Sequence, residues 1–397
     1  MDDVKDRSTL SRWSLIRSKA FGSREILGAL FGQTIGRVSA LRSLLHVYPK
    51  TIDPTAVAAG RIDAGDEVKC TIPVDQHVDG FLGQFTGSLG DCYSPGQLAL
   101  KCEVNIFELI DCGVLPWLNV TVHRPSARVV YGRPRSHKIA LGVPVRKISG
   151  TALAVMDMPS GVTNYYHFFE DLAVTLRALR SLNKFDRVAL LFSKRVAGYQ
   201  RPILDALVKR YPQLYIEYVE RREIIRADRL LQVVLRESHP ICRFALKEEW
   251  REIGSMVREH YGIGPSPQTR SVYFSRNNHK WRRLGNEDKL LNVLAKHRCE
   301  IIAPEALAHS EQVRLMTQVQ RLVGVEGAAL VNIVFADKPI TLLEIFPLRA
   351  AYPFYVALAL QLGHKYRSVM TNPAGWNERV TIDADKLDQA LRATTPG

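Results

Sequence analysis

The chain has 397 residues, of which 46% are hydrophobic and 24% charged, and its 54 basic side chains exceed its 40 acidic ones by 14. This composition, with no repeats or low-complexity tracts, argues against disordered and solenoid proteins, and the length favours two domains with an appendage. A basic surface is expected to attract nucleotide phosphates or anionic lipid headgroups. Nucleic acid is not an expected partner, because no RNA-recognition signature, zinc-finger spacing or concentrated basic helix occurs.

The sequence gives no indication of a bound metal or of a membrane span. Its six cysteines lack any CxxC or Cys/His spacing that would hold zinc, so we expect buried free thiols. The opening segment Met1-Asp2-Asp3 is acidic where a signal peptide is basic, and no apolar stretch reaches about 18 residues. We therefore expect a cytoplasmic protein without cofactor or metal that can lie peripherally at the inner face of a membrane.

Residues 1–112 are interpreted as an N-terminal extension of helix plus irregular β structure. Residues 24–47 have a helical pattern with Gly28, Gly32 and Gly36 on one stripe. This stripe fits packing against another helix, and an interfacial helix on anionic lipid is the alternative. After about residue 60, short alternating runs are broken by Gly, Pro and Asp, which is typical of irregular β structure.

Beyond residue 152 the sequence alternates between strands and helices, as in α/β proteins with parallel sheets. The first set comprises strands at 188–192, 215–219 and 230–235, and helices at 200–211 and 240–261. After a Gly/Pro-rich linker at 262–268, the second set has strands at 271–275, 300–303, 321–325 and 341–346, and helices at 286–297, 305–319 and 384–392. We therefore predict two Rossmann-like domains, residues 113–261 and 262–397, that face each other across a cleft, with ligands at the carboxyl ends of their strands.

A first group of polar and aromatic residues, Asn164-Tyr165-Tyr166-His167, opens the helical pattern that follows a Pro-Ser-Gly turn. His167 and Asp171 are four residues apart and share a helix face, so the carboxylate can raise the basicity of the imidazole or itself accept a proton. An aromatic-rich helix start with a solvated acidic turn is the alternative interpretation.

A second group lies at the end of the predicted strand 271–275 and at the following helix start, and it comprises Arg276, Arg283, Asn286 and Glu287. Guanidinium groups beside free backbone N–H groups suit a diphosphate. Ordinary surface arginines are the alternative.

A third group follows the strand 321–325. It consists of Glu326, Gly327, Ala328, Ala329 and Asn332. Small residues at such a turn let backbone amides approach a phosphate, although tight packing requires them too. Near the end of the next strand, the carboxylate of Glu344 can accept hydrogen bonds from two ribose hydroxyls, or it can be a solvated strand end.

The order of these groups resembles glycosyltransferase family 61, including its bacterial surface-polysaccharide members, over residues 152–347. The resemblance implies an inverting, metal-independent hexosyl- or pentosyltransferase of GT-B architecture, with a nucleotide-sugar donor such as UDP-N-acetylglucosamine or UDP-xylose. By the same resemblance, Arg276 and Asn286-Glu287 occupy donor-side positions and residues 327–332 form the nucleotide-sugar loop. Expected acceptors are hydroxyls of glycan or lipid-linked precursors, as in capsule polysaccharide biosynthesis.

One position departs from the family pattern. Glu326 stands where the family usually has His in a His-Gly-Ala sequence. A carboxylate beside a diphosphate is repelled unless it is protonated or turned toward sugar hydroxyls. A non-catalytic nucleotide-sugar or polysaccharide-binding protein that retains the fold is therefore the alternative function.

Overall fold

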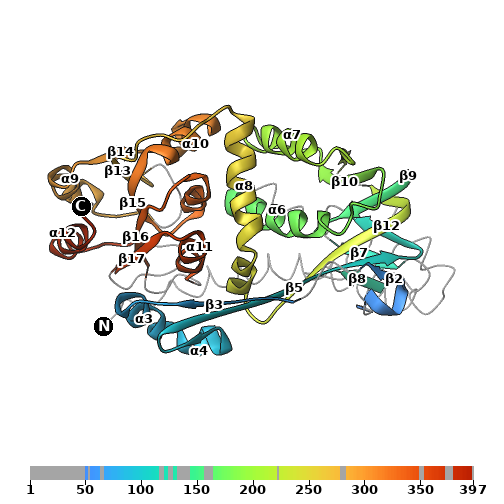
Figure 1. The fold of residues 1–397 in the computed structure, drawn as a ribbon, viewed down its shortest axis with the longest axis horizontal. Coiled ribbons are helices and arrows are strands. Elements are labelled where there is room, and N and C mark those ends of the chain that lie inside the picture. The colour runs from blue at the N-terminus through green and yellow to red at the C-terminus, as the bar shows by residue number, and fades with distance from the viewer. Residues whose placement is uncertain are drawn as a thin grey trace, which may run out of the picture.

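A computed structural model gives the fold (Figure 1). It describes residues 50–51, 54–62, 67–115, 120–123, 128–131, 144–155, 164–220, 223–277, 283–347, 353–371 and 379–395. The helix expected at residues 24–47 lies outside these ranges. Two β-sheets lie on opposite sides of the long helix α8 (Lys247–His260), as Figure 1 shows.

The C-terminal sheet is fully parallel, with the order β14-β13-β15-β16-β17. Its strands are β13 (Arg270–Phe274), β14 (Cys299–Ile302), β15 (Val319–Val325), β16 (Thr341–Phe346) and β17 (Lys365–Met370). Renumbered along the chain, this is the order 2-1-3-4-5 of a doubly wound sheet, whose winding reverses between β13 and β15. A ligand crevice is expected at the carboxyl ends of these two strands.

Helices cover both faces of this sheet because its buried residues alternate. Leu322 of β15 packs toward α10 (His309–Gln318), α11 (Phe354–Leu362) and the 3-10 helix η6 (Ala328–Phe335), whereas Val323 packs toward α9 (Glu287–Lys296) and α12 (Ala384–Ala393). The short 3-10 helix η5 (Pro304–Ala306) precedes α10. Successive side chains of a strand point to opposite faces, so both faces are apolar.

The other sheet has 12 strands and is mixed. Its main path is β1-β8-β7-β6-β12-β9-β10-β11, while β5 pairs with β12, β2, β3 and β4. The strands are β1 (Lys50–Thr51), β2 (Ala58–Ile62), β3 (Val68–Pro73), β4 (Tyr93–Ser94), β5 (Gln97–Leu109), β6 (Cys112–Leu115), β7 (Val120–His123), β8 (Arg128–Tyr131), β9 (Val145–Ala154), β10 (Val188–Ser193), β11 (Leu214–Val219) and β12 (Ile224–Glu237). Strands β9 to β12 are parallel to one another, in the order β12-β9-β10-β11, and β1 is parallel to β8.

Helices α6 (Tyr165–Leu179) and α7 (Gln200–Arg210) pack on one face of these parallel strands. The opposite face carries a second core cluster, whose described members all come from strands, including Phe107, Leu191 and Leu230. The expected Rossmann-like domain at residues 113–261 therefore differs from the structure: antiparallel strands extend the sheet, and strands rather than helices fill its second core.

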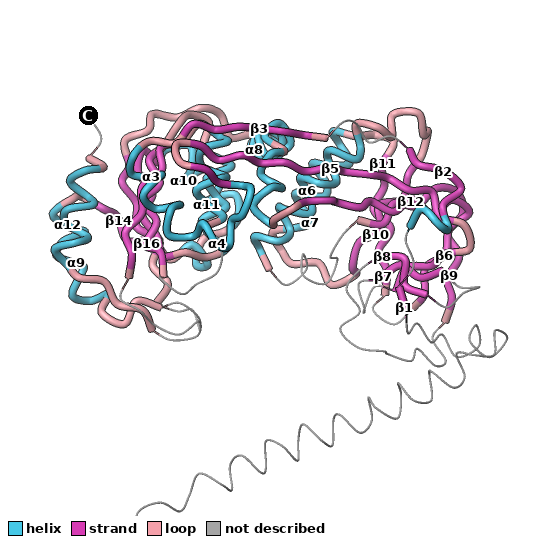
Figure 2. The backbone as a smooth tube through the Cα atoms, turned by 90° about the horizontal axis from the view of Figure 1, so that it is seen from below, coloured by secondary structure: helices cyan, strands magenta, loops and turns pink. Residues whose placement is uncertain are grey.

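An N-terminal arm, residues 67–109, spans the molecule from one sheet to the other (Figures 1 and 2). Besides β3, β4 and β5 it contains α3 (Gln76–Leu82), α4 (Thr86–Leu89) and the 3-10 helices η2 (Gly83–Phe85) and η3 (Gly90–Cys92). Another 3-10 helix, η1 (Pro54–Val57), precedes the arm. Arg367 of β17 donates to Asp75 at 2.7 Å, and the ring of Phe81 lies 5.2 Å from that of Phe346. The 13-residue strand β5 and these helices replace the irregular β structure expected here.

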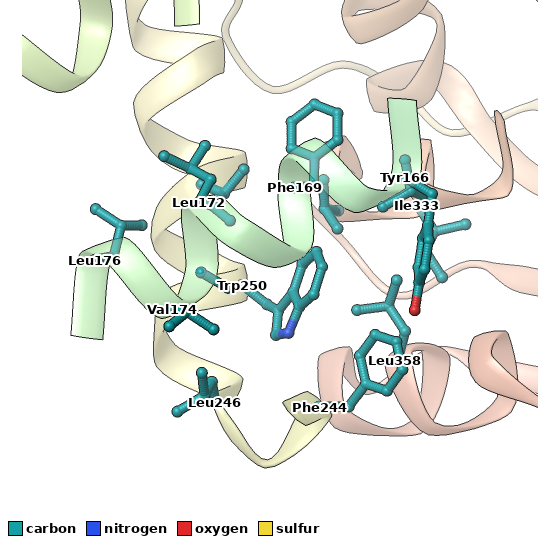
Figure 3. Close-up of a cluster of buried hydrophobic side chains, with 14 of the residues drawn as sticks. Tyr166, Phe169, Leu172, Val174, Leu176, Phe244, Leu246, Trp250, Ile333 and Leu358 are labelled. Carbon is teal, nitrogen blue, oxygen red and sulfur yellow. The ribbon is translucent and has the colours of Figure 1, made fainter. Parts of the chain in front are cut away.

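One continuous core joins the two sheets. Figure 3 shows its centre, where Phe169 and Leu172 of α6, Trp250 of α8, and Ile333 and Leu358 from the C-terminal half meet. The Trp250 indole stacks on Phe244 with 5.5 Å between ring centroids. Phe244 lies in the 3-10 helix η4 (Pro240–Ala245), which with α8 replaces the single helix expected at 240–261. The two halves thus share buried side chains at this point, and the predicted cleft between two domains stays a prediction.

The cysteines agree with a simpler expectation. All six cysteines are free thiols, and all except Cys70 are buried. None of the helices in the described ranges has the length and apolar character required to cross a bilayer.

Candidate functional site

Arg276 and Gly327 meet at the point where the winding of the C-terminal sheet reverses. Arg276 follows β13, and Gly327 follows β15 and begins η6. A Cβ atom built on Gly327 would lie 1.7 Å from Nη1 of Arg276. Because the backbone of Gly327 is extended, with φ 167°, the requirement for glycine is one of space for the guanidinium group.

The guanidinium group of Arg276 is held in a largely desolvated position. Burial lowers its pKa below the ordinary arginine value, while Tyr355, Glu305 and Tyr273 act in the opposite direction. An arginine remains charged under such a shift, so this edge of the sheet presents a cation in a low-dielectric setting, where it attracts an anion more strongly than in water.

Glu287 is hydrogen-bonded to residues at the end of β13. Its carboxylate is 4% exposed and accepts hydrogen bonds from Tyr273 Oη at 2.6 Å and Ser275 Oγ at 3.2 Å. Because Ser275 immediately precedes Arg276, this network orients the strand end. The sequence selected Glu287 for donor contact, and in the structure its carboxylate binds the protein itself.

Asn286 and Arg283 connect the start of α9 to the C-terminal segment. The Asn286 amide donates to Ile382 O at 2.7 Å and accepts from Ile382 N at 3.3 Å. The backbone carbonyl of Arg283 accepts from Val380 N at 2.9 Å. These contacts build the fold next to the strand end carrying Arg276.

The first turn of α6 contacts the same edge of the C-terminal sheet; we call this contact region the junction. Asn164 caps α6, accepting from the backbone of Tyr166 at 2.9 Å and of His167 at 3.3 Å. Tyr166 packs against Tyr355 with 5.7 Å between ring centroids, and Tyr355 Oη donates to Gly327 O at 2.7 Å. Tyr355 therefore contacts both the first group of sequence-predicted residues, through Tyr166, and the third group, through Gly327.

A chain of hydrogen bonds crosses the junction. Tyr165 Oη donates to Asn332 Oδ1 at 2.6 Å and lies 3.0 Å from Nε2 of His309, whose Nδ1 is 2.9 Å from Tyr261 Oη. Asn332 is fully buried and donates to Gln312 at 2.9 Å. Burial lowers the pKa of His309 to about 4 and raises that of Tyr165 well above its usual value, so both groups are neutral near pH 7. Asn332 and Tyr165 thus join the two halves.

His167 is paired with a carboxylate that sequence reasoning missed. Its Nδ1 lies 2.6 Å from Oε2 of Glu170, and the His167 side chain is 42% exposed while that of Glu170 is 3% exposed. Arg243 Nη1 lies 3.1 Å from the same oxygen and also pairs with Glu237. Burial lowers the pKa of Arg243, but the carboxylates of Glu170 and Glu237 more than offset this and raise it overall. The available signal was the spacing His-x-x-Glu, which places both groups on one helix face.

Asp171 occupies a different environment from His167. It lines an apolar cavity beneath α6 together with Phe168, Leu172 and Thr175, with Val155 directly after β9, and with residues of β10 and α7. Its backbone carbonyl accepts from Thr175 Oγ1 at 2.7 Å. The expected pairing of its carboxylate with His167 is replaced by the pairing of Glu170 with His167.

The remaining predicted residues differ in their exposure. Glu344 is fully buried within β16, where Tyr366 Oη donates to it at 2.8 Å. Glu326 is 6% exposed, and its backbone N–H donates to Ile345 O at 3.0 Å. Ala328 and Ala329, in the first turn of η6, are half-buried beside Gly327. Among the described residues, no group of three or more His, Cys, Asp and Glu is arranged to hold a metal ion.

Comparisons with known proteins give one family match. Residues 165–343 match the family model described as glycosyltransferase 61. No curated protein sequence matches the chain.

Two solved structures show a low similarity to this fold. One is dodecameric iron-containing heptosyltransferase TibC in complex with ADP-D-beta-D-heptose, with a TM-score of 0.28 and 12% identity over 67% of this chain and 78% of that chain. The other is TibC from enterotoxigenic E. coli H10407, with a TM-score of 0.25 and 13% identity over 73% and 79%. It is the family match that covers the junction: residues 165–343, which carry His167, Arg276 and Gly327, are similar to the glycosyltransferase 61 family.

Proposed function

We propose that the protein is an inverting, metal-independent glycosyltransferase. It transfers a sugar from a nucleotide-sugar, with a UDP-sugar as the leading candidate, to a hydroxyl of a glycan or polysaccharide precursor. The family match over residues 165–343 supports glycosyl transfer. The observation that carries the proposal is the contact between Arg276 and Gly327 at the reversal point of the sheet, next to the first turn of α6.

On the donor side, residues 262–397 bind the nucleotide-sugar. The Arg276 guanidinium pairs with the diphosphate, and the backbone from Gly327 to Ala329 approaches it closely. In an inverting displacement the leaving diphosphate gains charge, and a pre-positioned arginine in a desolvated site stabilises that charge. Glu287 and Asn286 hold this edge in place, and Glu326 faces the sugar or its phosphates from the same turn.

On the acceptor side, residues 113–261 supply the base. His167 is the stronger of the two candidates because its imidazole is partly exposed beside the junction and rests on a buried carboxylate. Asp171 is the other candidate. Tyr165 and Tyr166 position α6 against the donor side, and the acceptor is a glycan or a lipid-linked precursor at a membrane surface.

Nucleotide binding tests the donor assignment. Replacing Arg276 by Ala removes a charge-assisted pair worth about 1.5–3 kcal/mol, so UDP affinity measured by calorimetry should fall about tenfold or more. Gly327→Ala should have a similar effect, because its Cβ would displace the guanidinium. Gly264→Ala, at a glycine with nothing within 4 Å of its Cβ, is the matched control and should bind as the wild type does.

Turnover tests the reaction itself. A panel of nucleotide-sugars, assayed for release of the nucleotide with and without glycan acceptors, should reveal one preferred donor. UDP affinity that is unchanged in folded Arg276→Ala protein would contradict the donor assignment. Donor binding without turnover by the wild type would instead favour the non-catalytic alternative, and Glu326→His would then be the first variant to assay.

A further inference from the structure

The pairing of His167 with Glu170 has a geometry that selects one form of the imidazole. The Nδ1 atom lies 2.6 Å from Glu170 Oε2, and a carboxylate can only accept a hydrogen bond. Nδ1 therefore carries the hydrogen, and Nε2 of a neutral imidazole is left with a free lone pair. The side chain is 42% exposed, so that lone pair belongs to a partly solvent-accessible ring.

The carboxylate that makes this bond is itself fixed. Glu170 is 3% exposed, and its Oε2 also receives Arg243 Nη1 at 3.1 Å. Arg243 belongs to η4 and is bound on its other side by Glu237, with Nε to Oε2 at 3.2 Å. The network thus ties α6 to η4 and leaves the Glu170 carboxylate little freedom to rotate away from His167.

We propose that Glu170 is a positioning residue that fixes His167 with its hydrogen on Nδ1, so that Nε2 accepts the proton of the acceptor hydroxyl. This inference rests on the proposed function. In the step, the acceptor O–H bond breaks and its proton moves to Nε2, the acceptor oxygen bonds to the anomeric carbon, and the bond from that carbon to the nucleotide diphosphate breaks. Glu170 stays ionised and balances the imidazolium that forms.

A purely structural role for the same contacts is the competing explanation, since a buried carboxylate between α6 and η4 stabilises the fold in any case. The two explanations differ in what they predict for the imidazole. Free neutral histidine favours the hydrogen on Nε2, so a positioning role predicts a tautomer that depends on Glu170.

The tautomer can be measured directly. In protein with 15N-labelled histidine, the ring nitrogen shifts of neutral His167 should show the hydrogen on Nδ1, and the loss of signals in His167→Gln assigns them. In Glu170→Gln, which keeps the shape and removes the charge, the tautomer should move toward Nε2–H. Glu249→Gln is the matched control, because Glu249 is also a buried carboxylate in an ion pair, with Arg180 directly after α6 at 3.2 Å, and it should leave the tautomer unchanged.

Turnover then links the tautomer to the reaction. Glu170→Gln should lower kcat by about 10²-fold or more with UDP affinity within twofold of the wild type, whereas Glu249→Gln should retain wild-type kcat. A wild-type tautomer in Glu170→Gln, or a kcat equal to that of Glu249→Gln, would overturn the inference. If the wild-type protein turns over no nucleotide-sugar, the proposed function fails, and the tautomer measurement alone decides whether Glu170 positions His167.

Discussion

At the scale of single residues, Arg321 is a cation buried for structural reasons. Its side chain is 2% exposed and donates to Ser271 Oγ at 2.7 Å, Leu391 O at 2.9 Å and His297 O at 2.9 Å. Leu391 lies in the last turn of α12, and His297 follows α9. Carbonyl groups at helix ends lack partners within the helix and carry partial negative charge, which a guanidinium compensates.

Arg321→Met should therefore destabilise the fold strongly, by about 3 kcal/mol or more, because the carbonyl groups lose a charged donor and stay buried. The free energy of unfolding in urea measures this. Arg392→Met removes a side chain that is 66% exposed and should change the midpoint little. Equal effects of the two substitutions on the free energy of unfolding would contradict a stabilising role of the buried Arg321 contacts.

Two buried histidines make stability depend on pH. Burial lowers the pKa of His364 and of His309 to about 4. In His364, Nδ1 accepts a hydrogen bond from Ile340 N at 3.2 Å. Protonation of Nδ1 would turn it into a donor that faces the Ile340 N–H group, and the hydrogen bond would be lost. The unfolded chain takes up these protons near pH 6.5 and the folded chain only near pH 4, so stability falls as the pH drops through this window.

The wild-type protein should lose up to about 3 kcal/mol per histidine between pH 6.5 and pH 4. Urea unfolding at half-unit steps of pH measures the slope. His309→Gln and His364→Gln should each flatten it, and that difference separates the histidines from carboxylates that titrate in the same range. A slope unchanged in both variants would contradict the assignment.

At the scale of elements, Gly254 sets how closely α8 approaches η6. A Cβ on Gly254 would lie 2.1 Å from the backbone oxygen of Val334, and Arg258, one turn later, donates to Phe335 O at 3.1 Å. Because backbone atoms cannot yield as a flexible side chain can, any larger residue must push the two elements apart. Gly254 thereby allows η6, which begins directly after Gly327, to pack closely against α8.

Gly254→Ala is expected to destabilise the protein by about 1–3 kcal/mol, the usual cost of overpacking. Gly80→Ala is the matched control: Gly80 lies in α3, is exposed and has nothing within 4 Å of its Cβ. Its replacement should stabilise α3 by about 0.5–1 kcal/mol. Opposite shifts of the thermal midpoint are expected, and a stabilising effect of Gly254→Ala would refute the close approach.

At the scale of the whole molecule, the N-terminal arm and the shared core bind the two sheets into one unit. Figure 2 shows β3 and β5 running alongside the central helices toward the C-terminal sheet. At the far end, Ser368 N donates to His77 at 3.0 Å, and the Phe85 ring lies 5.3 Å from that of Phe346. Two sheets that share buried side chains cannot separate without exposing apolar surface to water.

The two sheets should consequently unfold in one cooperative transition. Hydrogen exchange followed by mass spectrometry should give β9–β12 and β13–β17 similar opening free energies. Phe81→Ala removes the ring contact between the N-terminal arm and Phe346, so it should lower the free energy of unfolding by about 3–5 kcal/mol. It should also lower hydrogen-exchange protection in both sheets. Independent unfolding of the sheets would contradict this expectation, as would a loss of protection confined to β16 and β17.

The sequence by itself determined the α/β class and four of the five strands of the C-terminal sheet, β13 to β16, because hydrophobic period is a local property. The assignment of Arg276 and Gly327 to a donor site stays a prediction. The sequence pattern placed the start of β15 two residues late and the start of α10 four residues early. Only the tertiary structure decided that Glu170 rather than Asp171 pairs with His167, because both spacings fit one helix face and packing against Arg243 selects between them. The union of the sheets in one core was likewise invisible, since contacts such as that of Asp75 with Arg367 join residues far apart in the chain.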